Sequence, residues 1–249
     1  MKSCAAGSQT IDRFLESLAV EKGYSVHTCR AYRTDLQEFA RIVSEAGREG
    51  STPARGVPAH FDPSGVDTLA IRGYLAALYK KNSKATIARK LSAVRSFFGF
   101  LLRQRLVERN PAETVLTPKQ EKKIPYYLTV DDVFRLLDMV QDDTLLGRRN
   151  RAIFETLYTA GTRVSELAGL DTTAVNLDES IIRVHGKGNK QRLVPIGTKA
   201  IAAIRAYRER LERETGITPD AGGPLFLNKD KGRLTPRSIG RILDRLVRQ

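Results

Sequence analysis

Cysteine, long apolar runs and a secretion signal are scarce or missing in this 249-residue sequence. Only Cys4 and Cys29 are present, so no disulfide framework is implied and a reducing compartment is favoured. No apolar stretch reaches the length that spans a bilayer, and residues 1–7 lack the apolar core of a signal peptide. We therefore expect a cytoplasmic protein without a membrane segment.

Acidic residues are too few to balance the basic ones. The chain has 42 lysines and arginines against 28 aspartates and glutamates, a net charge of +14. Residues 1–117 carry 18 basic and 11 acidic residues and the remainder carries 24 and 17, so each part has a net charge of +7. This even excess favours contact of both parts with a polyanion. The alternative is a soluble protein that is merely basic. A membrane surface is disfavoured, because the charges do not gather on one amphipathic helix.

Apolar residues at helical spacing fill the first half of the sequence. Residues suited to N-capping precede three of the predicted helices: Ser25, Asp67 and Ser83. Residues 48–66 are rich in glycine, proline and serine and predict a loop. We expect an all-α domain over residues 1–111.

The rest of the chain has a different pattern. Residues 112–126 hold two prolines and three lysines with little periodicity, which predicts a basic linker able to wrap a duplex. Over residues 127–249, two β-like runs at 181–184 and 193–196 flank a glycine-rich turn and predict a hairpin. Helices are expected after Thr129 and near 149–160, 197–214 and 235–248, with a β-like piece at 225–227. The fold class is thus two domains, one all-α and one mixed α+β.

Arg163 is the first candidate for chemistry. Gly161 is expected to end one helix and Arg163 to begin the next, so that the guanidinium projects from a helix junction. A guanidinium is planar, permanently charged and forked, which suits a transferring phosphate. Glu166 lies one turn further on and could hold Arg163 in place. The alternative is a surface arginine that only pairs with that glutamate.

Lys187 is the second candidate. It lies between Gly186 and Gly188 at the tip of the predicted hairpin, where glycines permit a tight turn and a close approach to DNA. A lysine can act as a proton donor to a leaving oxygen. The alternative is a solvated basic hairpin. A phosphate-binding P-loop is excluded because its G-x-x-x-x-G-K-[ST] pattern does not occur.

These elements together resemble the XerC/XerD group of tyrosine recombinases. The order is Arg163, then Lys187, then the run Gln191-Arg192-Leu193-Val194-Pro195-Ile196. The first half fits the helical DNA-clamping, SAM-like domain of that family through Ser25, Thr28, Tyr32, Asp35, Leu36 and Phe39, and through residues 86–91 with Arg95, Phe97, Phe98 and Asn110-Pro111. One departure is Thr162, where the family usually has Leu or Met, and it leaves the chemistry untouched.

The resemblance implies phosphoryl transfer without a metal or other cofactor. A tyrosine attacks a DNA phosphodiester, forms a 3′-phosphotyrosine bond and releases a 5′-hydroxyl, and another strand reverses the step. Arginines and histidines stabilise the non-bridging oxygens, and the hairpin lysine protonates the leaving oxygen. Arg163 and Lys187 match the first arginine and the lysine. The implied partners are a double-stranded recombination site and a second, XerD-like subunit in a tetramer.

The family's remaining groups are expected near the C-terminus: an H-x-x-R motif, a later His or Trp, and the nucleophilic tyrosine. His27 and Arg30 spell H-x-x-R, but they precede Arg163 and are interpreted as a chance match. No tyrosine follows Tyr207, which is predicted to be a core residue, as are Tyr126 and Tyr127 at the linker. We expect a catalytic domain that lacks its C-terminal portion and a chain that cannot cleave DNA alone.

DNA contacts need cations for phosphates and a few side chains for base edges. The candidates in the first domain are Arg30, Arg33, Lys84, Thr86, Arg89 and Lys90, and those in the second are Lys190, Arg192, Arg237 and Arg241. For each of them, a solvated charge or polar group is the alternative.

The sequence is interpreted as a recombinase that resolves chromosome dimers or integrates mobile DNA. Three other classes of protein are alternatives to this interpretation. A non-catalytic DNA-binding protein could occupy recombination sites. A helical transcription factor is disfavoured because it does not need the 186–192 hairpin. A type IB topoisomerase shares the arginine and lysine chemistry, but the first half matches the recombinase clamp instead.

Overall fold

The computed structural model describes residues 7–21, 23–46, 61–121, 124, 127–186, 188, 190–218 and 222–248. The chain divides into two compact units, residues 1–124 and 125–249, and each is described by itself. None of the described helices has the length and apolar character that a membrane span needs.

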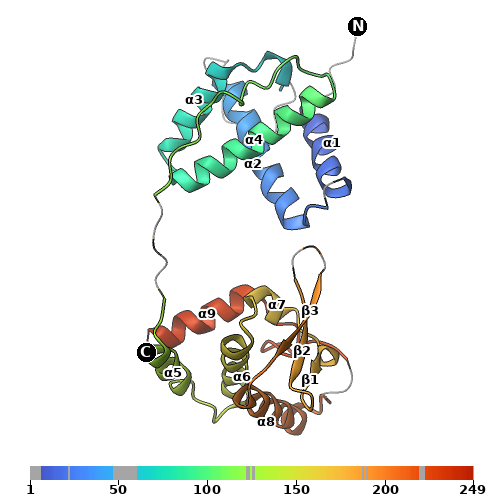
Figure 1. Cartoon of the computed structure of the whole chain (residues 1–249), viewed down its shortest axis with the longest axis vertical. Helices are drawn as coiled ribbons and strands as arrows, with labels where there is room; N and C mark the ends of the chain where they lie inside the picture. Colours follow the sequence, from blue (N-terminus) through green and yellow to red (C-terminus); the bar gives the residue numbers. More distant parts are fainter. Residues whose placement is uncertain are drawn as a thin grey trace. The chain divides into compact units, whose positions relative to one another are not determined.

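The first unit is a bundle of helices (Figure 1). Its elements are α1 (Gly7–Val20), α2 (Val26–Ala46), the short 3₁₀ helix η1 (Pro63–Gly65), α3 (Thr68–Tyr79) and α4 (Lys84–Arg103). α2 packs against α1, α3 and α4 around a shared core. Rings from all four α-helices meet in that core, where each ring centroid lies within 6.1 Å of a neighbouring one: Phe14, Phe39, Tyr74, Phe97 and Phe98. The predicted all-α domain is confirmed.

The predicted helix starts are confirmed as well. The side chains of Asp67 and Ser83 accept hydrogen bonds from backbone amides in the first turns of α3 and α4. The Ser25 hydroxyl accepts one from the Thr28 amide before α2. Each cap supplies an acceptor to an N–H group that has no partner within its helix.

The start of the predicted linker is packed against the first unit. Ala112 and Val115 are buried in its core. The Arg95 guanidinium on α4 donates to the carbonyl oxygens of both residues, at 3.2 and 2.8 Å. The chain therefore stays attached to the bundle beyond residue 111.

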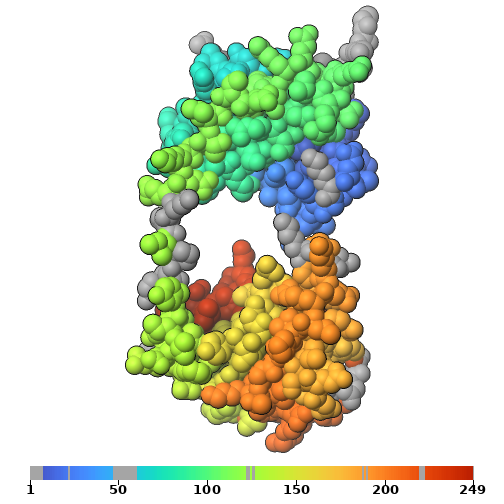
Figure 2. Space-filling view, in the orientation of Figure 1, coloured from blue at the N-terminus to red at the C-terminus, as the bar shows by residue number. Residues whose placement is uncertain are grey.

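The second unit combines helices with a small antiparallel sheet. Its elements are α5 (Val130–Asp138), α6 (Leu145–Ala160), α7 (Val164–Ala168), η2 (Thr172–Ala174), β1 (Val175–Asn176), β2 (Ile181–His185), β3 (Gln191–Pro195), α8 (Thr198–Thr215) and α9 (Pro236–Val247). The strand order is β1-β2-β3, and the register pairs Ile181 with Pro195 and His185 with Gln191. Helix α6 packs against α8, and α7 contacts both β2 and α9. The yellow surface around α7 adjoins the orange surface of β3 and α8 (Figure 2).

Several element boundaries differ from the sequence prediction. Helix α6 begins at Leu145, because Thr144 caps it through the Gly147 amide. β3 begins two residues before the predicted strand, and the two-residue strand β1 was too short to leave a period-2 pattern. The piece at 225–227 forms an isolated bridge, Leu227 with Arg233, instead of a strand.

Candidate active site

Arg163 lies where the sequence predicted, at a junction between two helices. Gly161 ends α6 in the left-handed conformation, with φ +56°, and its amide donates to the Leu157 carbonyl. Arg163 is the N-cap of α7, and its side chain is 69% exposed. A tight turn and a short helix thus present the guanidinium to solvent.

Glu166 holds Arg163 by two contacts. One carboxylate oxygen accepts from the Arg163 backbone amide and the other accepts from Nη1, both at 2.9 Å. The Glu166 side chain is only 4% exposed. The contact expected between these residues is therefore present, and it anchors an exposed cation on a buried anion.

The same carboxylate binds a second arginine. Arg192 on β3 donates from Nη1 to Oε1 at 2.9 Å and from Nη2 to Oε2 at 2.8 Å. These bonds, followed by those from Arg163, lower the pKa of Glu166 from 4.5 to about 2. The bond to Glu166 in turn raises the pKa of Arg192. Glu166 is therefore ionised at neutral pH and joins the start of α7 to the hairpin.

The start of the hairpin loop, at Gly186, lies close to this cluster. The Gly186 amide donates to the Lys190 carbonyl at 2.8 Å. A Cβ at Gly186 would lie 3.1 Å from Arg192 Nη1 and 3.5 Å from Glu166 Oε1, so a side chain would press on the ion pair. Lys187 follows Gly186 in the sequence and lies outside the described residues. Its role remains a prediction.

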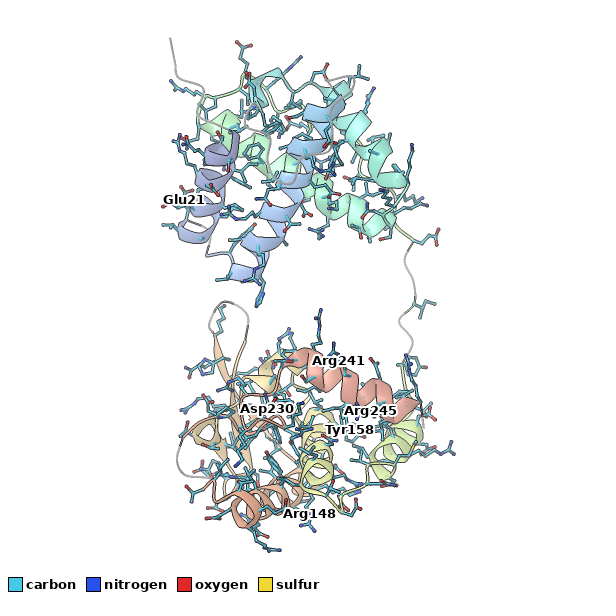
Figure 3. The ribbon with its side chains drawn as sticks, turned by 180° about the vertical axis from the view of Figure 1, so that it is seen from behind. Glu21, Arg148, Tyr158, Asp230, Arg241 and Arg245 are labelled. Atoms are coloured by element: carbon cyan, nitrogen blue, oxygen red, sulfur yellow. The ribbon has the colours of Figure 1, made fainter. Side chains whose placement is uncertain are left out.

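The other cations predicted in the second unit are on the surface. Lys190 is exposed at the start of β3, and Arg237 and Arg241 are exposed on α9. Arg241 and Arg245 follow one another along this helix (Figure 3). Helix α9 contacts α7, the helix that begins after Arg163.

The predicted DNA contacts of the first unit fall into three groups. Arg30 and Lys84 are exposed, and the Thr86 hydroxyl is bonded to Ser83 at 3.1 Å. Arg33 pairs with Asp12, and Arg89 pairs with Asp35 while its side chain stays 49% exposed.

Lys90 departs from its prediction. Its side chain is only 9% exposed, and its ammonium pairs with Asp35 and Glu38. The positive charge of Lys90 is therefore neutralised within the first unit. Asp35 itself was not predicted as a site residue. Its signal in the sequence is a carboxylate next to Leu36 on the apolar face of a predicted helix.

The tyrosines of the second unit differ in how far they are buried. Tyr207 is 1% exposed, as predicted for a core residue, and its hydroxyl accepts from the Leu227 amide at 3.2 Å. Burial raises its pKa. Tyr127 is 79% exposed, so its prediction as a packing residue is wrong, and Tyr126 lies outside the described residues. His27 and Arg30 are both exposed on α2. Within the described part of the chain, His, Cys, Asp and Glu form no group that could hold a metal ion.

Comparison with known proteins gives matches over most of the chain. Residues 126–249 match the phage integrase family, and residues 11–56 and 62–105 match the phage integrase N-terminal SAM-like domain. A tyrosine recombinase XerC of Pelobacter propionicus is 40% identical over 241 residues, which are 97% of this chain and 75% of that protein. One of Myxococcus xanthus is 43% identical over 242 residues, 96% of this chain and 77% of its own length.

Solved structures share the fold. A lambda integrase tetramer bound to a Holliday junction is matched with a TM-score of 0.65 at 15% identity, over 98% of this chain and 66% of that one. The Tn1549 transposon integrase in complex with circular intermediate DNA gives 0.64 at 19% identity, over 96% and 77%.

Proposed function

Since this chain belongs to the tyrosine recombinases of the phage integrase family, we propose that it acts on a specific DNA site in a XerC-like role. In this proposal Arg163 binds a non-bridging oxygen of the scissile phosphate. Lys187 donates the proton that the leaving 5′-oxygen needs. The XerC-named relatives support this role, and we propose that this chain resolves chromosome dimers.

The observation that carries the proposal is the pair of arginines on one buried carboxylate. Glu166 takes one Nη1 hydrogen of Arg163, and the other four N–H groups have no partner among the described residues. A fixed guanidinium with free donors on an exposed face suits a phosphate that gains charge during transfer, because little reorganisation is then needed. Arg192 ties the hairpin that carries Lys187 to the same carboxylate.

The last tyrosine within residues 1–249 is Tyr207, and its hydroxyl is buried and already hydrogen-bonded, so it is not suited to act as the nucleophile. We therefore propose that this 249-residue chain binds recombination-site DNA without cleaving it.

The partners follow from the chemistry. Strand exchange needs a second cleaved strand, and we propose a XerD-like subunit as its carrier in a tetramer on DNA. For a protein that acts on such DNA, we propose a cytoplasmic location. The first unit is proposed to clamp the duplex, together with the basic segment that follows it.

The test is a mobility-shift assay with a duplex selected by this chain from random-sequence DNA, followed by denaturing electrophoresis on a nicked version of that duplex. We expect specific binding and no covalent adduct. Arg163→Ala should weaken DNA binding. Arg163→Lys should regain the part of the affinity that depends on the positive charge, but not the part that depends on the two parallel N–H donors of a guanidinium. An adduct that survives denaturation would overturn the non-cleaving assignment. Absence of any binding would overturn the DNA-binding function itself.

A further inference from the structure

The first unit contains a buried ion cluster between α2 and α4. Asp35 is only 1% exposed, although it carries a charge in the middle of a packed helix. Both Nη groups of Arg89 donate to its two oxygens, Nη2 at 2.9 Å, and Lys90 Nζ adds a bond at 3.2 Å. Lys90 also binds Glu38.

Packing alone does not require such a cluster. Charges taken out of water lose hydration, and a buried ion pair is often no more stabilising than apolar residues of the same volume. The core around it is already rich in aromatic side chains, and the Tyr74 ring of α3 belongs to that core. The Asp35 carboxylate is better explained by the cations that it binds and orients than by any stability that it adds.

Arg89 is the most exposed member of the cluster. Its side chain is 49% exposed, against 31% for Glu38, 9% for Lys90 and 2% for Asp35. Two of its five N–H groups are used by Asp35, and the other three have no partner among the described residues. The bidentate pair fixes the plane of the guanidinium, because both Nη groups are tied to one rigid carboxylate.

The surroundings of Arg89 leave room for a ligand. Ala85 and Ser92, four residues before and three after it on α4, are small and exposed and lie on the same side of the helix. A DNA backbone can therefore come close to the guanidinium without meeting a large side chain from this helix.

We propose that Asp35 is a positioning residue for DNA binding, which orients Arg89 so that its free N–H groups meet an acceptor on the duplex. The acceptor is either a phosphate group or the O6/N7 edge of a guanine, and both can accept two hydrogen bonds from one guanidinium. Lys90 neutralises the second charge of the cluster and does not touch DNA. This inference rests on the proposed function, because it requires that the chain binds DNA.

The experiment compares two substitutions that change the charge equally. Asp35→Asn and Glu38→Gln each remove one negative charge and one partner of Lys90, but only the first releases Arg89. Electrostatics alone predicts that both variants bind DNA as tightly as the unchanged chain or slightly tighter. Our inference predicts instead that Asp35→Asn weakens binding about three- to tenfold while Glu38→Gln does not. Arg89→Gln should weaken it at least as much.

The measurement is the dissociation constant of the 249-residue chain for its selected duplex as a function of salt. A phosphate contact predicts that Arg89→Gln lowers the salt slope by about one, and a guanine contact predicts an unchanged slope with loss confined to the selected sequence. In the Arg89→Gln background, Asp35→Asn should cause no further loss, because its effect passes through Arg89.

Several outcomes would overturn the inference. One is that Asp35→Asn binds as tightly as Glu38→Gln, and another is that its loss of affinity persists in the Arg89→Gln background. If Asp35→Asn does not fold, Arg89→Lys replaces it, since lysine keeps the charge but not the fork. Wild-type affinity for Arg89→Lys would then contradict the inference. Absence of DNA binding by the unchanged chain would instead contradict the proposed function.

Discussion

Replacing Glu166 by glutamine tests the cluster that joins α7 to the hairpin. The amide cannot accept from both arginines as the carboxylate does, but Arg163 and Arg192 are 69% and 42% exposed and can regain water. The lowering of the Glu166 pKa from 4.5 to about 2 sets a ceiling of about 3 kcal/mol on the stabilisation. Solvent screening of the exposed partners reduces this, and we expect a loss of about 1–2 kcal/mol at pH 7.

The sign of the pH dependence follows from the direction of the shift. A carboxylate whose folded pKa is depressed contributes stability above its ordinary pKa, and this contribution is lost as pH falls through the folded value. The difference between the unchanged chain and Glu166→Gln should therefore be full above pH 4.5 and shrink towards pH 2.

Urea unfolding of the second unit, followed by the NMR signals of its core methyl groups between pH 7 and pH 2, measures this difference. Asp178→Asn is the matched control. It removes a carboxylate that pairs with Arg205 at 2.9 Å but is 92% exposed, and it should change stability by less than about 0.5 kcal/mol. A difference for Glu166→Gln that is absent at pH 7, or constant over the whole range, would refute the reasoning.

Two further pairs of substitutions test the packing of the units, with the urea unfolding midpoint as the measurement. The hydroxyl of Tyr74 is buried without a hydrogen-bond partner among the described residues, so Tyr74→Phe should leave stability unchanged or raise it by up to about 1 kcal/mol. The Tyr207 hydroxyl accepts from a backbone amide, so Tyr207→Phe should lower stability by about 1–2 kcal/mol, and equal effects would contradict this account. A Cβ at Gly147 would lie 2.2 Å from a backbone carbonyl oxygen, so Gly147→Ala should cost about 2 kcal/mol or more. A Cβ at Gly240 on α9 would meet nothing within 4 Å, so Gly240→Ala should stabilise by about 0.5–1 kcal/mol, and a loss there would be contrary to expectation.

The features that could be predicted from the sequence are those set by neighbouring residues. The N-caps Asp67, Ser83 and Thr129 are present because each side chain reaches the amide three residues further on. The hairpin of β2 and β3 follows from two β-like runs around a short turn. The junction at Arg163 follows from a glycine that ends α6.

The features that could not be predicted depend on contacts between distant segments. Arg192 binds a carboxylate 26 positions earlier in the chain, and only the packing of the hairpin on α7 brings the two residues together. Lys84 and Lys90 lie in the same helix and look alike in the sequence. One is exposed and the other is buried against Asp35, 55 positions away, because α2 packs on one side of α4 only.

In the proposed function, Arg163 and Lys187 act on one phosphate of the DNA. The most direct measurement is a scan of the selected duplex in which single phosphates are replaced by neutral methylphosphonates, with binding measured for the unchanged chain, Arg163→Ala and Lys187→Ala. We predict one position at which the replacement weakens the unchanged chain and at which both variants lose that sensitivity. Loss of sensitivity at two different phosphates, or at none, would contradict the account.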